Sequence, residues 1–256
     1  MTLAAYVLGL GVWTPELPDV STWLAGTPRP ALARPAAQLL PPRMRGRASL
    51  LTAMFAEVVE QATRAAGVEA QRLPGVFGSA YGEMGTTLTL LSQLQAAGAQ
   101  LSPAKFQASV HNTAAGQLSI ALSNPHFSTS LAAGHDTLAM CLLEGCAFLA
   151  QQPGQLLLAV AEEGASAVLQ PEAAYAPLAA AFVLASDAPP GAALARVHAP
   201  EVCEHEPRRE RARDNPLLPA LSLARAVLSG ERVDVPVNEA GAFGHTIHVQ
   251  SYRRSP

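Results

Sequence analysis

The sequence predicts an α/β fold built on a mixed, mostly parallel sheet that is covered by helices on both faces. Strand-like and helix-like segments alternate along most of the chain. Several strand-like segments are continuous apolar runs without alternation between apolar and polar residues, such as Gln155–Val160 after its first residue and Leu178–Ala185. Strands of that kind are buried on both faces, as in sheets with helices on either side. Hydrophobic residues make up 49% of the 256 residues and charged residues only 14%, which favours a large buried core.

The first half of the chain begins with the continuous apolar run Leu3–Leu10, which predicts a buried strand followed by a turn. The proline-rich segment from Trp13 to Pro42 is expected to be an ordered surface excursion. Arg43–Gly67 is predicted to be a helix, because its apolar residues recur at helical spacing and Gly67 suits the C-cap. The other elements expected here are strands at Gly75–Ala80 and Phe127–Ala132, helices at Glu83–Ala97 and Ala114–Leu122, and a central helix at Thr137–Gln151.

The second half is expected to form more of the same sheet. The charged segment Glu204–Asn215 has no apolar face and is predicted to be a solvated loop. One α/β domain spanning residues 1–256 is the simplest organisation. The expected elements are strands at Gln155–Val160, Leu178–Ala185, Ala193–Val202 and His245–Tyr252, and an amphipathic helix at Leu217–Leu228.

Composition excludes several classes of function. A net charge of -3 gives no electrostatic case for nucleic acid. The three cysteines are odd in number and lack metal-ligand spacing, so we expect no metal, no other cofactor and a reducing cytoplasm. The longest apolar runs fall short of the roughly 20 residues that span a bilayer, and the N-terminus lacks the basic region of an export signal. A soluble protein is expected.

Residues 110–145 are the most informative stretch of the chain. An Asn-Thr-Ala-Ala-Gly-Gln helix start at residues 112–117 precedes the buried strand Phe127–Leu131, and a tight Ala-Ala-Gly-His turn at residues 132–135 leads into a long buried helix. This order resembles the heart of a β-ketoacyl synthase, in which a turn of the type Thr-Ala-Cys-Ala-Ser-Gly carries the nucleophilic cysteine. Ala133 falls at the position of that cysteine, and a methyl group cannot attack a thioester. The resemblance implies a thiolase-like fold, corresponding to the N-terminal half of a ketosynthase, without its chemistry; the alternative is an ordinary core alanine in a misaligned turn.

The resemblance covers most of the chain but not the second half of a complete synthase. That half carries two histidines that activate the malonyl thioester, and neither of their sequence environments occurs here. Ala242–Thr246 (Ala-Phe-Gly-His-Thr) is similar to the family's final Gly-Phe-Gly-Gly-Thr loop, which predicts a truncated domain that keeps the first half and the last strand. The segments that match the first half are Ala5–Gly11, Met44–Gly67, Gly75–Ser79, Leu101–Pro103 and Leu178–Leu184.

Because it lacks the cysteine, the chain resembles a chain length factor of this family. Its short length is most similar to the factor of aryl-polyene-type pigment clusters. The resemblance implies a non-catalytic subunit that forms a heterodimer or higher heteromer with a full-length synthase. Such a subunit shapes the acyl tunnel in polyketide, polyene or fatty-acid-type elongation and meets the acyl carrier protein through the complex. The residues implied at the tunnel or interface are Leu101, Phe106, Ala108, Val110, Asn112, Phe127, Thr129, Leu131 and Phe243.

Two other functions remain open from the sequence. The chain could be a stand-alone acyl-thioester hydrolase or decarboxylase in which His135 is a general base oriented by Asp136. Adjacent side chains on a helix point in different directions, so helix capping by Asp136 is favoured over this dyad. The third class is a self-associating acyl-binding protein.

The remaining polar candidates have ordinary structural interpretations. Asn112 is expected to cap a helix, beside His111. His245 and His248 should face opposite sides of a strand, which disfavours a metal pair. Ser79 lies in a Gly-Ser-Ala-Tyr-Gly segment with the wrong spacing for a nucleophile elbow. Glu162-Glu163 is expected in a solvated loop, and the Arg208–Arg213 cluster, which could attract an acidic carrier protein, is neutralised by interleaved acidic residues.

Overall fold

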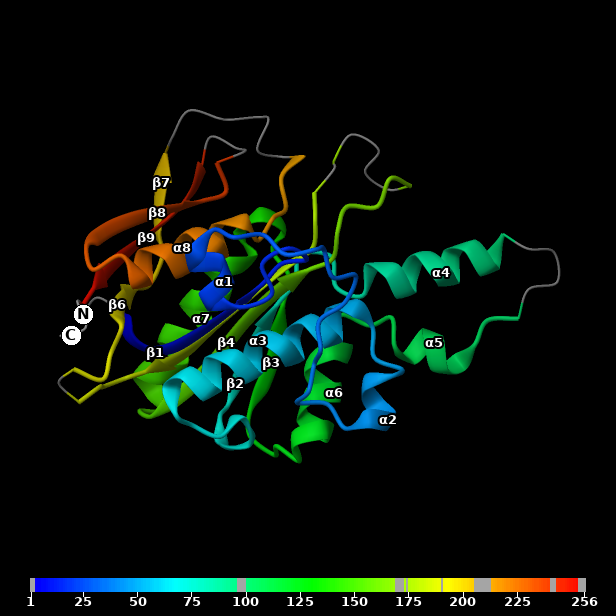
Figure 1. The fold of residues 1–256 in the computed structure, drawn as a ribbon, viewed down its shortest axis with the longest axis horizontal. Helices are drawn as coiled ribbons and strands as arrows, with labels where there is room; N and C mark the ends of the chain where they lie inside the picture. Colours follow the sequence, from blue (N-terminus) through cyan, green and yellow to red (C-terminus); the bar gives the residue numbers. More distant parts are fainter. Residues whose placement is uncertain are drawn as a thin grey trace.

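The computed structural model describes residues 3–95, 100–168, 173, 175–189, 191–204, 213–239 and 243–252. These residues form a nine-stranded sheet in the order β3-β2-β4-β5-β1-β6-β9-β7, with β8 paired to β9 (Figure 1). The strands are β1 Ala4–Trp13, β2 Gly75–Gly78, β3 Ser128–Leu131, β4 Gln155–Glu162, β5 Leu178–Ala185, β6 Ala195–His198, β7 Glu201–Glu204, β8 Arg232–Val237 and β9 Phe243–Ser251. The helices are α1 Val20–Ala25, α2 Pro42–Arg45, α3 Leu50–Ala66, α4 Met84–Leu94, α5 Pro103–Gln107, α6 Thr113–Leu122, α7 Thr137–Gln151 and α8 Leu218–Leu228, with short 3₁₀ turns η1 Ala70–Arg72 and η2 Gly134–Asp136.

The predicted mixed sheet is confirmed, but its parallel part is smaller than expected. Only the two pairings within β3-β2-β4 are parallel, and the other six described pairings are antiparallel. The strand β3 pairs only with β2 within the described chain, so it forms an open edge of the sheet. This edge lies at the turn that the sequence singles out.

Two cores lie on opposite faces of the central strands. Alternate residues of β4 face in opposite directions: Leu156 and Leu158 pack with α7 and α8, whereas Leu157 and Ala159 pack with α3 and α6. Burial on both faces explains why β4 is apolar at every position from Leu156 to Ala161. The first core continues under β8 and β9, because α8 contacts these two strands on one side and β1 and β5 on the other.

The outer face of β8 and β9 is polar. Val235 and Ile247 point inward and are buried, whereas Arg232, Asp234 and His248 alternate with them on the solvent side. An antiparallel sheet with this alternation needs no helix on its outer face.

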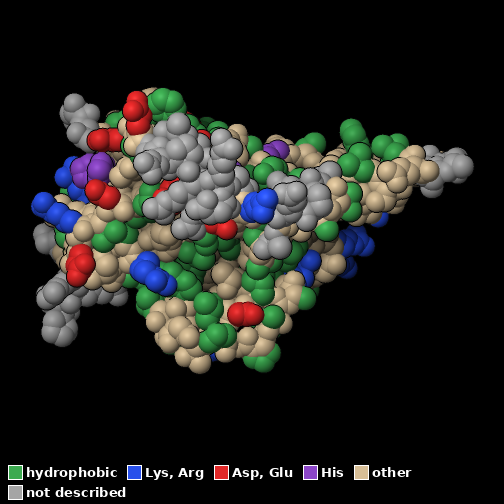
Figure 2. Space-filling model, turned by 90° about the horizontal axis from the view of Figure 1, so that it is seen from above, with side chains coloured by type: hydrophobic (Ala, Val, Ile, Leu, Met, Phe, Trp, Pro, Cys, Tyr) green, Lys and Arg blue, Asp and Glu red, His purple; other side chains and the backbone are tan. Residues whose placement is uncertain are grey.

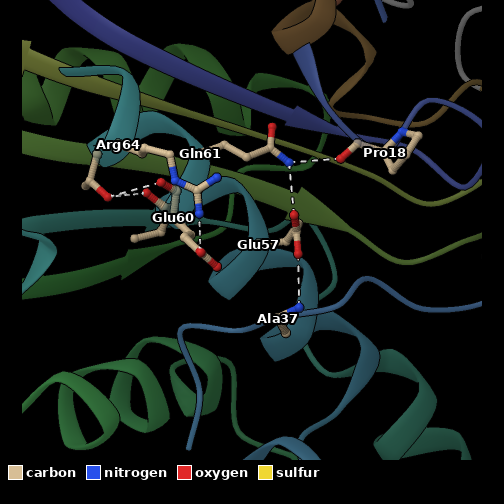
Figure 3. A network of polar contacts seen from close by, with 8 residues as sticks. Pro18, Ala37, Glu57, Glu60, Gln61 and Arg64 are labelled. Atoms are coloured by element: carbon tan, nitrogen blue, oxygen red, sulfur yellow. Dashed lines mark hydrogen bonds and ion pairs between the residues drawn. The ribbon is translucent and has the colours of Figure 1, made fainter. Parts of the chain in front are cut away.

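The proline-rich segment after β1 is ordered, as predicted, and polar residues of α3 hold it in place (Figure 3). The Glu57 carboxylate accepts a hydrogen bond from the Ala37 backbone N–H at 2.9 Å. The Gln61 side-chain amide donates to the Pro18 carbonyl at 2.9 Å and to Glu57 at 3.2 Å. One face of α3 therefore packs in the core, and its polar residues Glu57 and Gln61 bind the proline-rich segment.

Several predicted boundaries differ from the structure for local reasons. The helix expected over Arg43–Gly67 is two helices, because Ser49 caps α3 by accepting a hydrogen bond from the Thr52 N–H. Gly67 is the predicted C-cap, with a φ of +70°. The strand expected over Ala193–Val202 is two strands, β6 and β7, separated before Glu201 by a proline that lacks an N–H. The sequence analysis missed β8, which contains Pro236, and the short helices α1 and α5.

None of the helices in the described ranges combines the length and the apolar character that crossing a bilayer requires.

Candidate functional site

The turn at the expected nucleophile position is fully formed. It follows β3, and Gly134 adopts a left-handed conformation with a φ of +55°, which glycine tolerates best. The Ala133 N–H donates to the Thr137 hydroxyl at 3.0 Å, and this hydroxyl donates to the Gly134 carbonyl at 2.7 Å. Thr137 therefore closes the turn and begins α7, while Ala133 presents only a methyl group.

The carboxylate of Asp136 joins parts of the chain that are far apart in sequence. Its Oδ2 accepts a hydrogen bond from the Asn238 amide at 2.7 Å, and its Oδ1 lies 2.9 Å from Nδ1 of His245. The His245 side chain is 18% exposed and that of Asp136 28%, so water reaches the pair only partly. The expectation that the Asp136 side chain caps α7 is wrong, because the carboxylate is turned toward β9.

The neighbouring His135 does not join this pair. It lines a small cavity together with residues of α8 and β8 such as Leu218 and Pro236. Asp136 instead contacts residues that come more than 100 positions later in the chain. The hydrolase hypothesis paired His135 with Asp136, whereas the structure pairs His245 with Asp136 and places no nucleophile at Ala133.

His245 and His248 face opposite sides of β9, as expected. His248 lies on the outer face, with Nδ1 2.7 Å from Asp234, and this hydrogen bond raises the pKa of His248 above its ordinary value. Within the described ranges, no group of three or more His, Cys, Asp or Glu residues is placed to hold a metal ion.

Glu162 ends β4 and is buried, and Glu163 is half-buried, so the expected solvated loop is wrong. Glu162 is 1% exposed, and its Oε2 accepts hydrogen bonds from the Ser79 hydroxyl at 3.0 Å and from the backbone N–H groups of Ala80 and Tyr81. Burial raises the pKa of Glu162 to about 7. The Ser79 oxygen also accepts from the Gly82 N–H at 2.9 Å, so this serine is committed to the loop rather than to catalysis.

The predicted tunnel and interface residues fall into two groups. Phe106, Ala108 and Val110 lie on or just after α5, where Phe106 is 62% exposed, with Leu101 partly buried just before this helix. Phe127, Thr129 and Leu131 lie on or beside the edge strand β3, and the Phe127 ring stacks on Phe148 with 5.1 Å between centroids. Phe243 is exposed at the start of β9, and Ala242 lies outside the described residues.

Asn112 occupies the N-cap position of α6, but its side chain makes no capping hydrogen bond, so that expectation is wrong. Its neighbour His111 instead contacts the Ser79 carbonyl through Nε2 at 2.8 Å. The network centred on Glu162 thus reaches the segment that carries Ala108 and Val110.

Sequence comparison decides the family. The model for the β-ketoacyl synthase N-terminal domain matches residues 21–239. The chain belongs to the β-ketoacyl synthase N-terminal domain family. No protein among the curated sequences matches it.

This ketosynthase-like chain shares its thiolase-like fold with solved structures of low sequence identity. A chain of the ketosynthase ApeO in complex with its chain length factor ApeC, from Xenorhabdus doucetiae, is 19% identical with a TM-score of 0.72, over 97% of this chain and 99% of that one. A chain of the AntDE:AntF complex, a type II polyketide synthase carrier protein with its ketosynthase, is 11% identical with a TM-score of 0.76, over 98% and 100%. The ishigamide ketosynthase/chain length factor is 17% identical with a TM-score of 0.63, over 78% and 67%.

Two surface features of this ketosynthase-like chain were missed by the sequence analysis. The arm that α4 and α5 form projects from the body and exposes hydrophobic side chains, including Leu91 and Leu94 (Figures 1 and 2). The chain also has five arginines and no acidic residue between Asp19 and Glu57, and Arg43 and Arg47 are exposed. A count of charges along the sequence would have found this basic segment. Of the Arg208–Arg213 cluster considered earlier, residues 208–212 lie outside the described residues.

Proposed function

We propose that this chain is a non-catalytic chain length factor that pairs with an active β-ketoacyl synthase and shapes the acyl tunnel. The observation that carries the proposal is the turn at Ala133. The turn is closed by Thr137 and leads into the buried helix α7, yet it carries no thiol or hydroxyl that could become an acyl acceptor. The chain thus has the fold of a condensing enzyme but lacks the side chain that would accept the acyl group.

The exposed edge of the sheet supports pairing with a related subunit. Among the residues that the structure describes, nothing pairs with the outer side of β3, and natural proteins seldom leave such an edge open. Phe127 is 45% exposed beside it, and Phe106 and Val110 are exposed on the α5 segment. A synthase with its own β3 edge would continue the sheet and cover these side chains.

The polar outer face of β8 and β9 supports a single truncated domain over residues 1–256. Since Arg232, Asp234 and His248 suit contact with water, this face requires no covering helices. We assign the chain to the short type of aryl-polyene-type systems on the resemblance of its sequence, and the match with a chain of the ApeO–ApeC complex over 97% and 99% of the two lengths supports the short form. Its three free thiols suit the cytoplasm.

Co-expression with a full-length synthase tests the pairing. We expect a stable heteromer whose interface buries more than about 2,000 Å² in total, as in obligate complexes. A monomeric and thermally stable chain with no affinity for a cognate synthase would contradict the proposal.

Acylation tests the absence of catalysis. The isolated chain and the heteromer are incubated with acyl and malonyl carrier-protein thioesters, and the intact masses are measured. We expect an acyl adduct on the synthase and none on this chain. A stable adduct on any residue of this chain would favour the rival function as a stand-alone acyl-thioester hydrolase.

A further inference from the structure

A cavity of about 830 Å³ opens beside the central strand β1. Residues of α3, such as Ala65, and residues of α8, such as Val227, both line it. These two helices belong to the cores on opposite faces of the sheet. The cavity therefore lies at an edge of β1 rather than over one face, and its volume is in the range of ligand sites.

This edge exists because β6 covers only the first part of β1. The pairing with β6 runs from Ala4 to Val7, and the Leu194 N–H donates to the Val7 carbonyl at 2.8 Å. A β-bulge then interrupts the register with β5 between Val7 and Gly9, and bulges commonly end a pairing. Beyond the bulge, only β5 pairs with β1 in the described ranges.

The hydrogen bond of a neighbouring residue fixes the direction of the Leu10 backbone. The Val12 N–H donates to the Gln61 side chain at 3.2 Å and so points away from β5. In an antiparallel pair, alternate residues point their N–H and C=O groups to the same side. The N–H and C=O of Leu10 therefore also point away from β5.

The pairing of β4 with β5 gives the same direction independently. The Leu157 N–H donates to the Pro74 carbonyl at 2.9 Å, toward β2, so the next residue, Leu158, points its backbone groups to β5. Its partner there is Phe182, which is also the residue opposite Leu10. Because Phe182 points its groups to β4, it does not bond Leu10.

The Leu10 backbone thus presents a donor and an acceptor to the cavity. Leu10 is 3% exposed and lines the cavity, so these groups do not face open solvent. Gln61 takes up the Val12 N–H, but within the described part of the chain no residue takes up the N–H or C=O of Leu10. Buried backbone groups are almost always paired, so this donor and acceptor indicate a ligand.

Several polar side chains of the wall are already engaged within the protein. Ser21 donates to Asp19 at 2.6 Å, and the Asp19 carboxylate caps α1. Ser229 donates to the Ala226 carbonyl at 2.8 Å. Polar recognition at the floor of the cavity therefore comes mainly from the backbone of Leu10.

The ligand that satisfies such a pair of groups is one residue of an extended peptide. Two residues opposite each other in an antiparallel pair exchange both of their hydrogen bonds. Their side chains lie on the same face of the sheet, so the ligand's side chain would lie on the face of Leu10. Leu10 and Val227 belong to the same core, so this side chain should be apolar.

The two flanking side chains of such a peptide would lie on the other face. Gly9 and Gly11 pack against α3 on that face, where Gln61 and Arg64 line the cavity. Arg64 is 71% exposed and lies at the rim, and Tyr252 supplies a further hydroxyl group. Polar side chains therefore suit the flanking positions.

We propose that this cavity binds an extended peptide segment of a partner protein, in which one apolar residue lies between two polar residues and adds its backbone to the edge of β1. Main-chain hydrogen bonds then supply affinity, and the alternating side chains supply specificity. Since β1 lies four strands away from β3 in the sheet, the inference does not rest on the proposed function.

Titration of blocked peptides into the chain tests the inference by calorimetry and NMR. The probe is acetyl-Thr-Val-Thr-amide, and we expect it to shift the amide signal of Leu10 in leucine-labelled protein. Methylation of the central backbone nitrogen removes the donor to the Leu10 carbonyl and should weaken binding roughly two- to tenfold, the value of a typical hydrogen bond. Methylation of the first nitrogen, which points away from β1, should leave the affinity unchanged.

A cavity-filling variant gives the matching test on the protein. Ala65→Phe places a ring in the cavity from α3 and should abolish binding. Ala150→Phe is the control, because Ala150 is likewise exposed but lies on α7, which does not line the cavity. Circular dichroism checks that both variants fold.

Three results would overturn the inference: no shift of the Leu10 signal at millimolar peptide, equal affinity for the two methylated peptides, or binding unaffected by Ala65→Phe. Pantetheine is the comparison ligand, because an extra carbon separates its amides relative to those of a peptide. If pantetheine binds as tightly as the peptide, the site recognises amides in general and the peptide assignment is wrong.

Discussion

At the scale of single residues, the buried carboxyl of Glu162 should make the free energy of unfolding depend on pH. The pKa of this carboxyl rises from 4.5 to about 7 because the group is buried, even though three donors oppose the shift. A pKa that is higher in the folded state contributes stability below about pH 4.5 that is lost as the pH rises through 7. The full effect corresponds to about 3 kcal/mol in the free energy of unfolding.

Glu162→Gln keeps an acceptor for Ser79 but cannot ionise. We expect the wild type to lose about 3 kcal/mol more than this variant between pH 4.5 and pH 8, measured by urea unfolding. Glu69→Gln is the control, because the Glu69 side chain is 57% exposed. Parallel pH profiles of the wild type and Glu162→Gln would show that Glu162 stays ionised in the folded chain.

At the scale of elements, the backbone of β3 predicts which substitution blocks pairing. The Phe127 carbonyl accepts from the Gly75 N–H at 2.9 Å and the Leu131 carbonyl from the Ser79 N–H at 3.2 Å. The backbone N–H and C=O groups of the odd-numbered residues of β3 therefore point toward β2. Those of Ser128 and Ser130 point to the open edge. Ser130→Pro removes an outward N–H without breaking a bond to β2.

We expect Ser130→Pro to weaken the heteromer at least tenfold in Kd while the chain remains folded. The loss combines a missing hydrogen bond with the proline ring at the interface, and a factor of ten equals about 1.4 kcal/mol. Analytical ultracentrifugation measures the affinity, and circular dichroism checks the fold. Ser130→Ala should bind normally; an unaffected Ser130→Pro variant would place the interface elsewhere.

The α5 segment makes a second prediction at this scale. Ala108→Phe adds volume beside the proposed tunnel, and forcing bulk into a packed site costs about 1–3 kcal/mol, or roughly tenfold or more against the next elongation. We expect shorter products from this variant and longer ones from Phe106→Ala or Leu101→Ala, read as masses of carrier-bound chains. An unchanged distribution from three folded, pairing variants would refute the tunnel assignment.

At the scale of the whole molecule, the fold was more predictable than the contacts at the site. Strand β5, and β4 between its two polar ends, are apolar at every position because they lie between two cores, and that signal is local. Strand β8 was missed because Pro236 and alternating charges are typical of loops as well as of edge strands. The pairing of Asp136 with His245 joins residues 109 positions apart, so only the tertiary fold reveals it.

The carboxylates of Glu162 and Glu163 illustrate the same limit. A pair of acidic residues after a strand predicts solvent, because burying a charge is costly. The structure offsets this cost with hydrogen bonds from Ser79, Ala80 and Gly85, whose positions depend on the loop after β2. The family's Ala133 turn, by contrast, is contiguous in sequence and was recognisable there.

The distribution of charge over the whole molecule predicts how the complex meets its carrier protein. The net charge is -3, yet Arg43 and Arg47 lie exposed in a segment without acidic residues. Such a patch attracts an acidic carrier protein mainly by steering its approach, and salt screens the attraction with a Debye length of about 10 Å at 0.1 M. The double variant Arg43→Glu/Arg47→Glu should therefore raise the KM of the heteromer for carrier-bound substrate several-fold at low salt.

The effect should shrink when the ionic strength is raised, while kcat and the affinity for the synthase stay the same. Arg72→Glu is the control, because the Arg72 side chain is 76% exposed and pairs with Glu69 outside the basic segment. Steady-state kinetics at two salt concentrations separate the cases. If Arg72→Glu raises KM as much as the double variant, the effect reflects net charge alone. If neither does, the carrier protein docks on the synthase without help from this surface.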